Sequence, residues 1–334
     1  MIIAVDAMGG DKAPEVIVEG VIQALKEIPQ ISIILVGDRT KVEKELERYH
    51  NYPYQRISLQ IAEEVIGMEE SPVAALKRKR NSSIQVAVNL IKEGRAEALV
   101  SAGNTGAVVA ITTLHLGLLP GVERAGIAIV IPTLKDPCLI IDVGANINPR
   151  PLHLFQYAIM AKVYAEQILQ REKPRIGLLN IGEEESKGTN FVKETFSFFK
   201  SRNGNLLNFI GYIEGRDIFA GEVDCVVCDG FVGNIVLKVA ESLGETITEM
   251  LRRELSRNIF SKSVSLLLKN RLKNLKKNLD YSEYGGAPLL GTQKICIIAH
   301  GASSAKAIKN AIRVAKEFGG HRINNNIVEA LKKY

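Results

Sequence analysis

Residues 98–107 read ALVSAGNTGA, and the fold prediction starts from this stretch. Ala98 to Ser101 are apolar or small, which is typical of a short buried strand. The next residues are a turn rich in glycine and asparagine, and an apolar segment of helical period follows. A strand that passes through a polar turn directly into a helix is the repeating unit of an α/β fold.

The same junction recurs at five other places. The turns are DAMGGDKAP (6–14), SAGNTGA (101–107), DVGANINPRP (142–151), NIGEEESKGT (180–189), DGFVGN (229–234) and HGASS (300–304). About ten apolar runs have strand length: Ile2–Val5, Ile31–Val36, Ile57–Ile61, Ala98–Ser101, Ile127–Ile131, Leu139–Asp142, Ile176–Asn180, Asn208–Ile213, Val223–Cys228 and Ile295–Ala299. The sequence predicts an α/β fold with a largely parallel sheet, in one large sheet or two connected lobes, because no linker marks a boundary.

In an open α/β sheet the turns after parallel strands lie together at the carboxyl edge. We therefore expect the six turns to meet there. Glycines let main-chain N–H groups approach a ligand, and helix N-termini add positive dipole ends, a combination suited to phosphate. The G-x-x-x-x-G-K-[ST] motif is absent, and no G-x-G-x-x-G follows a strand, which argues against an ATPase or an ordinary dinucleotide dehydrogenase.

Composition indicates a soluble globular protein. The 334 residues are 46% hydrophobic and 24% charged, and no apolar run approaches the ~20 residues of a membrane-spanning helix. The N-terminus reads directly into a strand, so we expect no signal peptide and a cytoplasmic location.

Of the four cysteines, Cys225 and Cys228 form a C-x-x-C inside an apolar run, where we expect buried strand residues on opposite faces rather than a redox or zinc site.

The basic charge is local. The chain has 43 Lys and Arg against 37 Asp and Glu, but residues 252–277 alone carry nine cations and one acid, so the remainder is slightly acidic. Apolar periodicity predicts a helix from Ile235 to Leu255, and a second stripe, from Val264 to Leu279, would complete a hairpin that projects from the sheet. The leucines pack the hairpin, and its basic, partly apolar tip fits an anionic membrane surface or a dimer interface. Nucleic acid is disfavoured because aromatic residues are not interleaved with the cations.

Other polar residues have both a structural and a functional interpretation. Lys187 is either a salt-bridged surface residue or a cation at a phosphate site, and Asn234 is expected to cap the long helix, with or without a ligand. Ser303 and Ser304 are either nucleophiles or, preferably, helix caps beside His300. The basic run Lys77, Arg78, Lys79 and Arg80 is either solvated surface or a steering patch for an acidic partner. No metal-binding pattern is present, and no cofactor is implied.

Taken together, DAMGGD, SAGNTGA, DVGAN, GEEESKGT, the segment from Glu214 to Lys238, DYSEYGGAPLLG and HGASSAKAIKNAI resemble the bacterial fatty-acyl-carrier-protein:phosphate acyltransferase (PlsX) family, in order to about Ile312. The resemblance implies a Rossmann-like α/β/α sandwich related to phosphate acetyltransferases and isocitrate dehydrogenases. It implies one catalytic domain over residues 1–334, in which residues 234–280 form the projecting hairpin. One departure is Lys294, at a position where the family commonly has glycine.

The resemblance also implies the reaction. A long fatty acyl group would pass from acyl carrier protein or coenzyme A to inorganic phosphate, and the acyl phosphate would feed a membrane glycerol-3-phosphate acyltransferase. The enzyme would be a homodimer, peripheral to the inner face of the cell membrane. Since phosphate is a competent nucleophile and a thiolate leaves readily, positioning and charge stabilisation suffice for this chemistry.

The resemblance and the turn pattern together give the expected site. The residues expected to be catalytic are Lys187 and Asn234. Those expected to bind phosphate or substrate are Asp6, Gly9, Gly10, Asp11, Ser101, Gly103, Asn104, Thr105, Gly106, Asn146, Gly188, Thr189, Gly233, His300 and Ser303. The expected membrane contacts are Phe260, Val264, Leu266, Leu267 and Leu268, and the carrier protein is expected to dock on Lys77, Arg78, Lys79 and Arg80.

Overall fold

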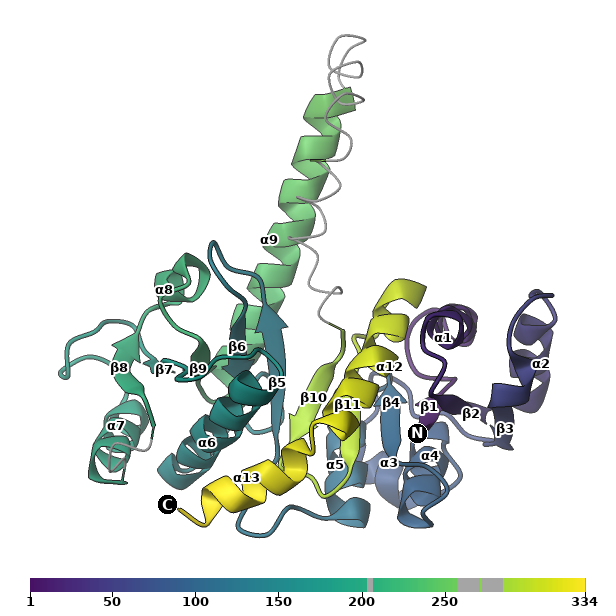
Figure 1. Cartoon of the computed structure of the whole chain (residues 1–334), viewed down its shortest axis with the longest axis horizontal. Helices are drawn as coiled ribbons and strands as arrows, with labels where there is room; N and C mark the ends of the chain where they lie inside the picture. The colour runs from purple at the N-terminus through teal and green to yellow at the C-terminus, as the bar shows by residue number, and fades with distance from the viewer. Residues whose placement is uncertain (203–206, 257–270, 272–284, 334) are drawn as a thin grey trace.

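The computed structural model describes residues 1–202, 207–256, 271 and 285–333. Within these ranges one sheet of eleven strands runs through the molecule in the order β3-β2-β1-β4-β11-β10-β5-β6-β9-β7-β8, with helices on both faces (Figure 1). The strands are β1 (Ile2–Asp6), β2 (Ser32–Gly37), β3 (Ile57–Ile61), β4 (Ala98–Ser101), β5 (Gly126–Ile131), β6 (Cys138–Ile141), β7 (Ile176–Leu179), β8 (Phe209–Ile213), β9 (Cys225–Val227), β10 (Ala287–Leu290) and β11 (Ile295–Ile298).

The helices are α1 (Glu15–Glu27), α2 (Arg39–Leu46), a 3-10 turn η1 (Tyr54–Arg56), α3 (Pro72–Arg78), α4 (Ser83–Lys92), α5 (Thr105–Leu116), α6 (Pro151–Gln167), α7 (Asn190–Arg202), α8 (Gly215–Ala220), α9 (Gly230–Ser256), α12 (Ala305–Gly320) and α13 (Ile323–Leu331). None of them, within the described ranges, has the length and apolarity needed to cross a bilayer.

The mostly parallel α/β sheet is confirmed. All ten expected strands are present, with ends that differ by at most two residues. The strand that the sequence did not predict is β10, because Pro288 and the glycines on either side of the strand are typical of a turn.

Strand direction corrects one expectation. β3, β2, β1, β4 and β11 are mutually parallel, β10 is antiparallel to both its neighbours, and β5 is antiparallel to β6. β6, β9, β7 and β8 are again parallel to one another, so they run opposite to the β1 group. The prediction that all six turns meet at one carboxyl edge is therefore wrong. Three turns leave one edge of the sheet and three leave the other.

The cysteines are core residues, as expected. All four are free and buried. Cys225 packs in the cluster that contains Leu139 and Ile141, whereas Cys228 packs in the cluster on the other face, with Cys138 and Ile140. Burial raises the pKa of every one of these thiols, that of Cys296 to about 12, so they stay protonated at neutral pH.

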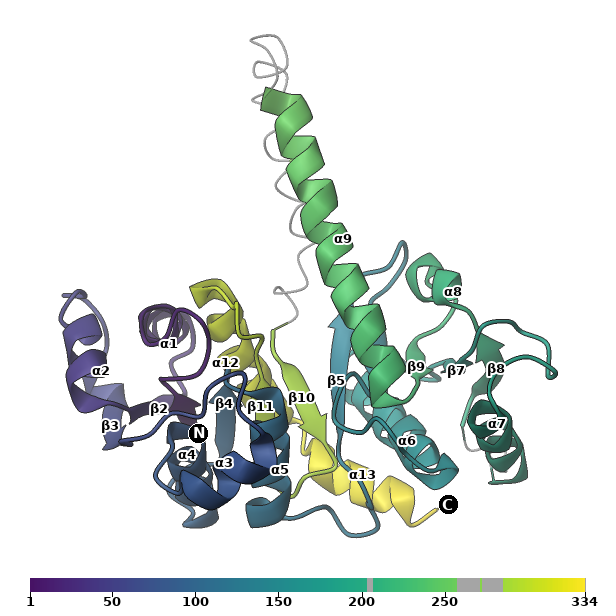
Figure 2. The ribbon, with the colours of Figure 1, turned by 180° about the vertical axis from the view of Figure 1, so that it is seen from behind.

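α9 begins against the sheet, where it contacts β6, and then projects far beyond it (Figures 1 and 2). It begins at Gly230, five residues before the expected start at Ile235, and ends at Ser256. The expected second helix of the hairpin lies outside the described residues. So do the expected membrane contacts Phe260, Val264, Leu266, Leu267 and Leu268.

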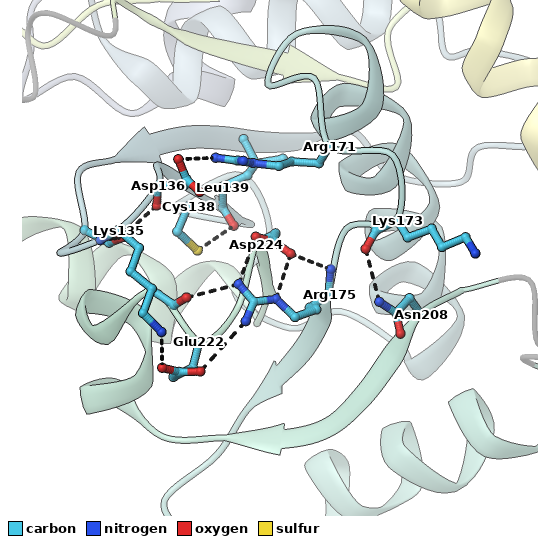
Figure 3. A network of polar contacts seen from close by, with 12 residues as sticks. Lys135, Asp136, Cys138, Leu139, Arg171, Lys173, Arg175, Asn208, Glu222 and Asp224 are labelled. Atoms are coloured by element: carbon cyan, nitrogen blue, oxygen red, sulfur yellow. Dashed lines mark hydrogen bonds and ion pairs between the residues drawn. The ribbon is translucent and has the colours of Figure 1, made fainter.

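A charged network joins β7 and β9, which are neighbours near one end of the sheet (Figure 3). The Arg175 side chain donates from Nε to Asp224 Oδ2 at 3.0 Å and from Nη2 to Asp224 Oδ1 at 3.1 Å, and the Arg175 main-chain N–H donates to Oδ2 at 2.7 Å. Burial alone would raise the pKa of Asp224, but the hydrogen bonds and charge of Arg175 outweigh burial and hold that pKa below its ordinary value. The ionised carboxylate therefore joins the start of β7 to the start of β9.

We predict that Asp224→Asn lowers the free energy of unfolding at pH 7 by about 2 kcal/mol, because charge-assisted hydrogen bonds are lost. Since the folded-state pKa of Asp224 is lowered, its contribution is present above about pH 4 and is lost as the pH falls further. Urea titrations from pH 3 to pH 7 measure this difference. The control is Asp136→Asn, whose more exposed ion pair with Arg171 at 2.9 Å is worth under about 1 kcal/mol. An equal loss in both variants, or an Asp224→Asn deficit that persists at low pH, would contradict the assignment.

Candidate functional site

One cavity joins the two halves of the sheet. Its volume is about 560 Å³, within the range of small-molecule sites. From the β1 group it is lined by Asp11, Thr105, Gly106, and the turn from His300 to Ser303. From the other group it is lined by Gly144 and by four residues of α9: Asn234, Leu237, Lys238 and Glu241. Residues from both carboxyl edges thus meet at this cavity, although their strands run in opposite directions.

The turns after β1, β4 and β11 form one scaffold. Asp6 is buried and accepts from Ser101 Oγ at 2.7 Å and from Met8 N–H at 3.1 Å. The Asp11 N–H donates to the Gly301 carbonyl at 2.9 Å. A side chain at Gly9 would collide with the Gly103 N–H, so the two turns touch by their backbones. Burial raises the pKa of Asp6, against the opposing effect of these hydrogen bonds.

Two helix N-termini face the cavity from this scaffold. Asn104 caps α5 by accepting from the Ala107 N–H at 3.0 Å, and Ser304 caps α12 by accepting from the Ala307 N–H at 3.3 Å. The expectation that Ser304 is a helix cap is confirmed. Because helix N-termini carry unpaired N–H donors and positive partial charge, this side of the cavity favours an anion.

The turn after β6 is built around the Asp142 carboxylate. Oδ1 accepts main-chain N–H groups of Ile127, Gly144 and Ala145 at 3.0, 3.1 and 2.9 Å, and Oδ2 accepts that of Asn146 at 2.7 Å. Burial raises the pKa of Asp142, and these four hydrogen bonds oppose that rise. The carboxylate therefore holds the turn against β5.

α9 is anchored on this turn. The Gly230 N–H donates to the Asn146 carbonyl at 2.8 Å, and Gly233 lies directly against the main chain of Asp142. Asp229 accepts from the N–H groups of Phe231 and Val232, both at 3.0 Å. The expectation that Asn234 caps the helix is therefore wrong, because Asp229 satisfies the first-turn donors and Asn234 lies inside the helix.

One face of α9 lines the cavity. Asn234, Lys238 and Glu241 are four and three residues apart, so they share that face. From Asn234 to Glu241 the helix rises about 10 Å, which carries this face from one edge of the sheet toward the other. Because Lys238 and Glu241 follow Asn234 at helical spacing, the helical pattern of the sequence was a signal for both, and sequence reasoning missed them.

An acid and an imidazole face each other across the cavity. His300 Nε2 lies 3.9 Å from Glu241 Oε2, and His300 Nδ1 accepts from the Ala302 N–H at 3.2 Å. In the neutral ring the proton is therefore on Nε2, the nitrogen toward Glu241. Burial raises the pKa of Glu241, while the charges of His300 and Lys238 act in the opposite direction. The polar end of the cavity thus combines a cation, an amide, an imidazole, a carboxyl group and two helix N-termini.

Several expected site residues lie elsewhere. Lys187, Gly188 and Thr189 belong to the turn after β7, which does not line the cavity. Lys187 is exposed and makes no ion pair with any residue in the described ranges, so the salt-bridge alternative finds no support. Asn146 has a structural role, since its Nδ2 donates to the Ala125 carbonyl at 2.6 Å and to the Tyr157 hydroxyl at 2.8 Å.

The basic run at the end of α3 is divided. Lys77, Arg78 and Arg80 are exposed, but Lys79 pairs with Glu70 and donates to the Val65 carbonyl at 2.7 Å. Asn104 Nδ2 reaches the same loop and donates to the carbonyls of Gly67, Met68 and Glu70 at 3.0–3.2 Å. The loop carries Met68 and Glu69 to the cavity wall. Lys79 thus holds part of the site in place.

Lys294 fits its position without strain. The described non-glycine residues with positive φ are Gln170 and Arg322, so Lys294 does not need the left-handed conformation that favours glycine. The Thr292 hydroxyl donates to the Lys294 carbonyl at 2.8 Å.

Comparison with known proteins identifies the family. A family model described as "Fatty acid synthesis protein" matches residues 1–326. A phosphate acyltransferase of Nitratidesulfovibrio vulgaris is 48% identical over 332 residues, which cover 99% of this chain and 94% of that protein. The chain belongs to the phosphate acyltransferase family. A second relative of that name, from Dictyoglomus turgidum, is 48% identical over 334 residues and covers 100% of this chain and 98% of its own length.

The resemblance drawn from the motifs is thereby confirmed, and the protein is an acyltransferase. Solved structures agree on the fold. A phosphotransacetylase from Streptococcus pyogenes has a TM-score of 0.60 at 18% identity and covers 99% of this chain and 94% of its own. The EutD phosphotransacetylase from Staphylococcus aureus has a TM-score of 0.56 at 16% identity, with 100% and 94% covered.

We predict that Gly233→Ala lowers the free energy of unfolding by about 1–3 kcal/mol, because its methyl group would overlap the Asp142 carbonyl oxygen and displace α9. Chemical denaturation measures the change. The matched control is Gly215→Ala at the start of α8, where an added Cβ meets nothing within 4 Å and no loss is expected. Equal stability of the two variants would mean that α9 does not depend on this contact.

Proposed function

We propose that this acyltransferase moves a long fatty acyl group from acyl carrier protein, or from coenzyme A, to inorganic phosphate, and that the acyl phosphate serves phospholipid synthesis. The observation that carries the proposal is the polar end of the cavity, where the N-termini of α5 and α12 face Asn234 and Lys238. A small, highly charged anion is the ligand that this combination favours. The names of the relatives and of the family model support acyl transfer with phosphate.

The proposed reaction needs no enzyme nucleophile. A phosphate oxygen attacks the thioester carbonyl carbon, the carbonyl oxygen becomes an oxyanion, and the carbon–sulfur bond breaks to release a thiolate. Phosphate held by the helix N-termini is already placed for attack. The Asn234 amide donates to a phosphate or carbonyl oxygen, and the Lys238 ammonium offsets the negative charge that accumulates as the two reactants meet.

Lys187 is included in the proposal because the family resemblance implies a role for it, although it does not line the cavity. Its turn follows β7, and β7 is parallel to β9, so this turn leaves the sheet at the same edge as the start of α9. That shared edge supports a role for Lys187 in binding the phosphate or the donor. The proposal also includes binding by other residues of the expected site, among which Asp11, Thr105, Gly106, His300 and Ser303 line the cavity.

The proposed partners follow from surface chemistry. Lys77, Arg78 and Arg80 are exposed cations beside the cavity loop, which supports docking of an acidic carrier protein there. The face of α9 opposite the cavity exposes the apolar side chains Val232, Ile235, Val239, Leu243 and Met250. Such a stripe supports a homodimer, or a hairpin whose basic tip touches an anionic membrane at the inner face of the cell. The membrane glycerol-3-phosphate acyltransferase would then receive the acyl phosphate without its release into water.

We predict that the purified chain releases free thiol from palmitoyl carrier protein only when phosphate is present, and that Asn234→Ala reduces kcat about 10²–10³-fold because a donor to the reacting oxygens is lost. A thiol-reactive dye measures the release. Asn325→Ala, a change on α13 away from the cavity, serves as the control and should retain full turnover. Thiol release that does not require phosphate would contradict the proposed function.

We predict that Lys187→Ala folds normally and loses at least about a hundredfold in turnover, as removal of a charge-stabilising group does. Lys200→Ala is the matched control, since Lys200 is an exposed cation near the same turn that pairs with Glu185 at 2.5 Å. Circular dichroism checks the fold and the thiol assay measures the rate. If Lys187→Ala turns over like Lys200→Ala, Lys187 has no role in the reaction.

We predict that the full chain floats with anionic vesicles and not with neutral ones, and that the double change Phe260→Asp and Leu267→Asp abolishes this binding by placing charge at the apolar tip. Leu134→Asp, at a side chain that is 88% exposed on another loop, is the control and should bind as the unmodified chain does. Equal flotation of all three proteins would remove the membrane role of this segment.

A further inference from the structure

The sheet opens between its two central strands. Among the residues that the structure describes, β10 and β5 pair at only two positions, Leu290 with Gly126 and Leu289 with Ile127. Beyond them β10 stays paired with β11, through Pro288 and Ala287, while β5 stays paired with β6 up to Ile131. Pro288 has no N–H to donate, so it cannot extend the ladder toward β5. We call the unpaired space between residues 287–288 of β10 and residues 128–131 of β5 the seam.

The cavity enters this seam. Ile129, Val130 and Ile131 of β5 all line it, and so does the segment from Gly285 to Pro288 at the start of β10. Successive residues of a strand point to opposite faces of the sheet, so a cavity that touches three in a row reaches the edge of β5 and not only one face. Tyr164 of α6, which packs with Phe318, also lines the cavity and belongs to the hydrophobic cluster that holds Leu139 and Ile141. The seam therefore leads from one face of the sheet toward the other.

The seam is chemically unlike the rest of the cavity. Its described lining consists of aliphatic side chains, glycine and proline, together with the ring of Tyr164. Val143, Leu237 and Ile298 continue this apolar wall toward the end where Asn234, Lys238 and His300 lie. A ligand that fits both parts has a polar, anion-binding head and a long apolar tail.

We propose that the seam between β5 and β10 holds the alkyl chain of the acyl donor, with the thioester carbonyl at the polar end of the cavity. The inference rests on the proposed function and adds the path of the chain. In this arrangement the first carbons lie beside Leu237 and Val143, and the later carbons lie between Ile129 and Ala287. The depth of the seam then sets the acyl length that is accepted, and Ile129, which is partly exposed, is a specificity-determining residue.

The test is a bulky side chain in the seam. Ile129→Trp is assayed by phosphate-dependent thiol release with butyryl, octanoyl and palmitoyl coenzyme A. The expected result is a fall of at least about tenfold in the ratio of kcat/KM for palmitoyl over butyryl donor, since one methylene of misfit in an apolar pocket is worth that much. Ile57→Trp, on edge strand β3 and away from the cavity, is the matched control and leaves the ratio unchanged.

Fluorescence shows whether the new side chain occupies the seam. The chain has no tryptophan, so the single indole of each variant reports its own surroundings. We expect blue-shifted emission from Ile129→Trp and emission nearer to that in water from Ile57→Trp. If Ile129→Trp fails to fold, Ala287→Leu occupies the opposite wall and gives the same readout of chain length.

The outcomes separate the two claims. A folded Ile129→Trp variant, or Ala287→Leu in its place, that slows all donors equally or none of them overturns the assignment of the seam while the wild-type activity stands. Wild-type protein that releases no thiol from any donor in the presence of phosphate overturns the proposed function itself. A selective loss of the long donor supports the seam as the acyl site.

Discussion

The carboxylate of Asp142 is the contact on which the site depends. It accepts four main-chain N–H groups, one from the start of β5 and three from the turn that follows β6. Gly233 rests on the backbone of the same residue, so the position of α9 follows from the position of this turn. Since α9 carries Asn234, Lys238 and Glu241, a buried acid that does not itself line the cavity positions the part of the polar wall that α9 supplies. These four hydrogen bonds offset the cost of burying the carboxylate in the core.

Reversal of strand direction explains why the long helix is needed. The β1 group and the β6 group end at opposite edges, so their turns alone would make two separate half-sites. α9 starts at the edge where β9 ends, and two turns along it Glu241 Oε2 lies 3.9 Å from His300 Nε2. The antiparallel strands β10 and β5 that cause the reversal also form the seam. The same topological feature therefore brings the polar groups together and leaves an apolar space beside them.

The wall of the cavity that the turns after β1, β4 and β11 form is held in place by residues that do not line the cavity. The Ser101 hydroxyl donates to buried Asp6 and fixes the turns after β1 and β4 relative to each other. Asn104 both caps α5 and holds the loop from Gly67 to Glu70, to which Lys79 is also paired. Residues expected to bind substrate thus divide into those that line the cavity and those that hold the lining in place, a division common in preorganised sites.

Local sequence pattern determined the secondary structure, the fold class and the family of this protein. The ten predicted strands, the core cysteines, the α/β class and the family motifs follow from periodicity and turn chemistry, which act over a few neighbouring residues. The start of α9 was misplaced because a capping preference for Asn234 competed with Asp229, and only the backbone geometry shows which one accepts the N–H groups. Strand β10 escaped notice because its proline and glycines are typical of turns. The direction of each strand, the meeting of Lys238, Glu241 and His300, and the exclusion of the Lys187 turn from the cavity were decided by tertiary structure. They depend on pairings between segments far apart in the chain, and no local propensity encodes those pairings.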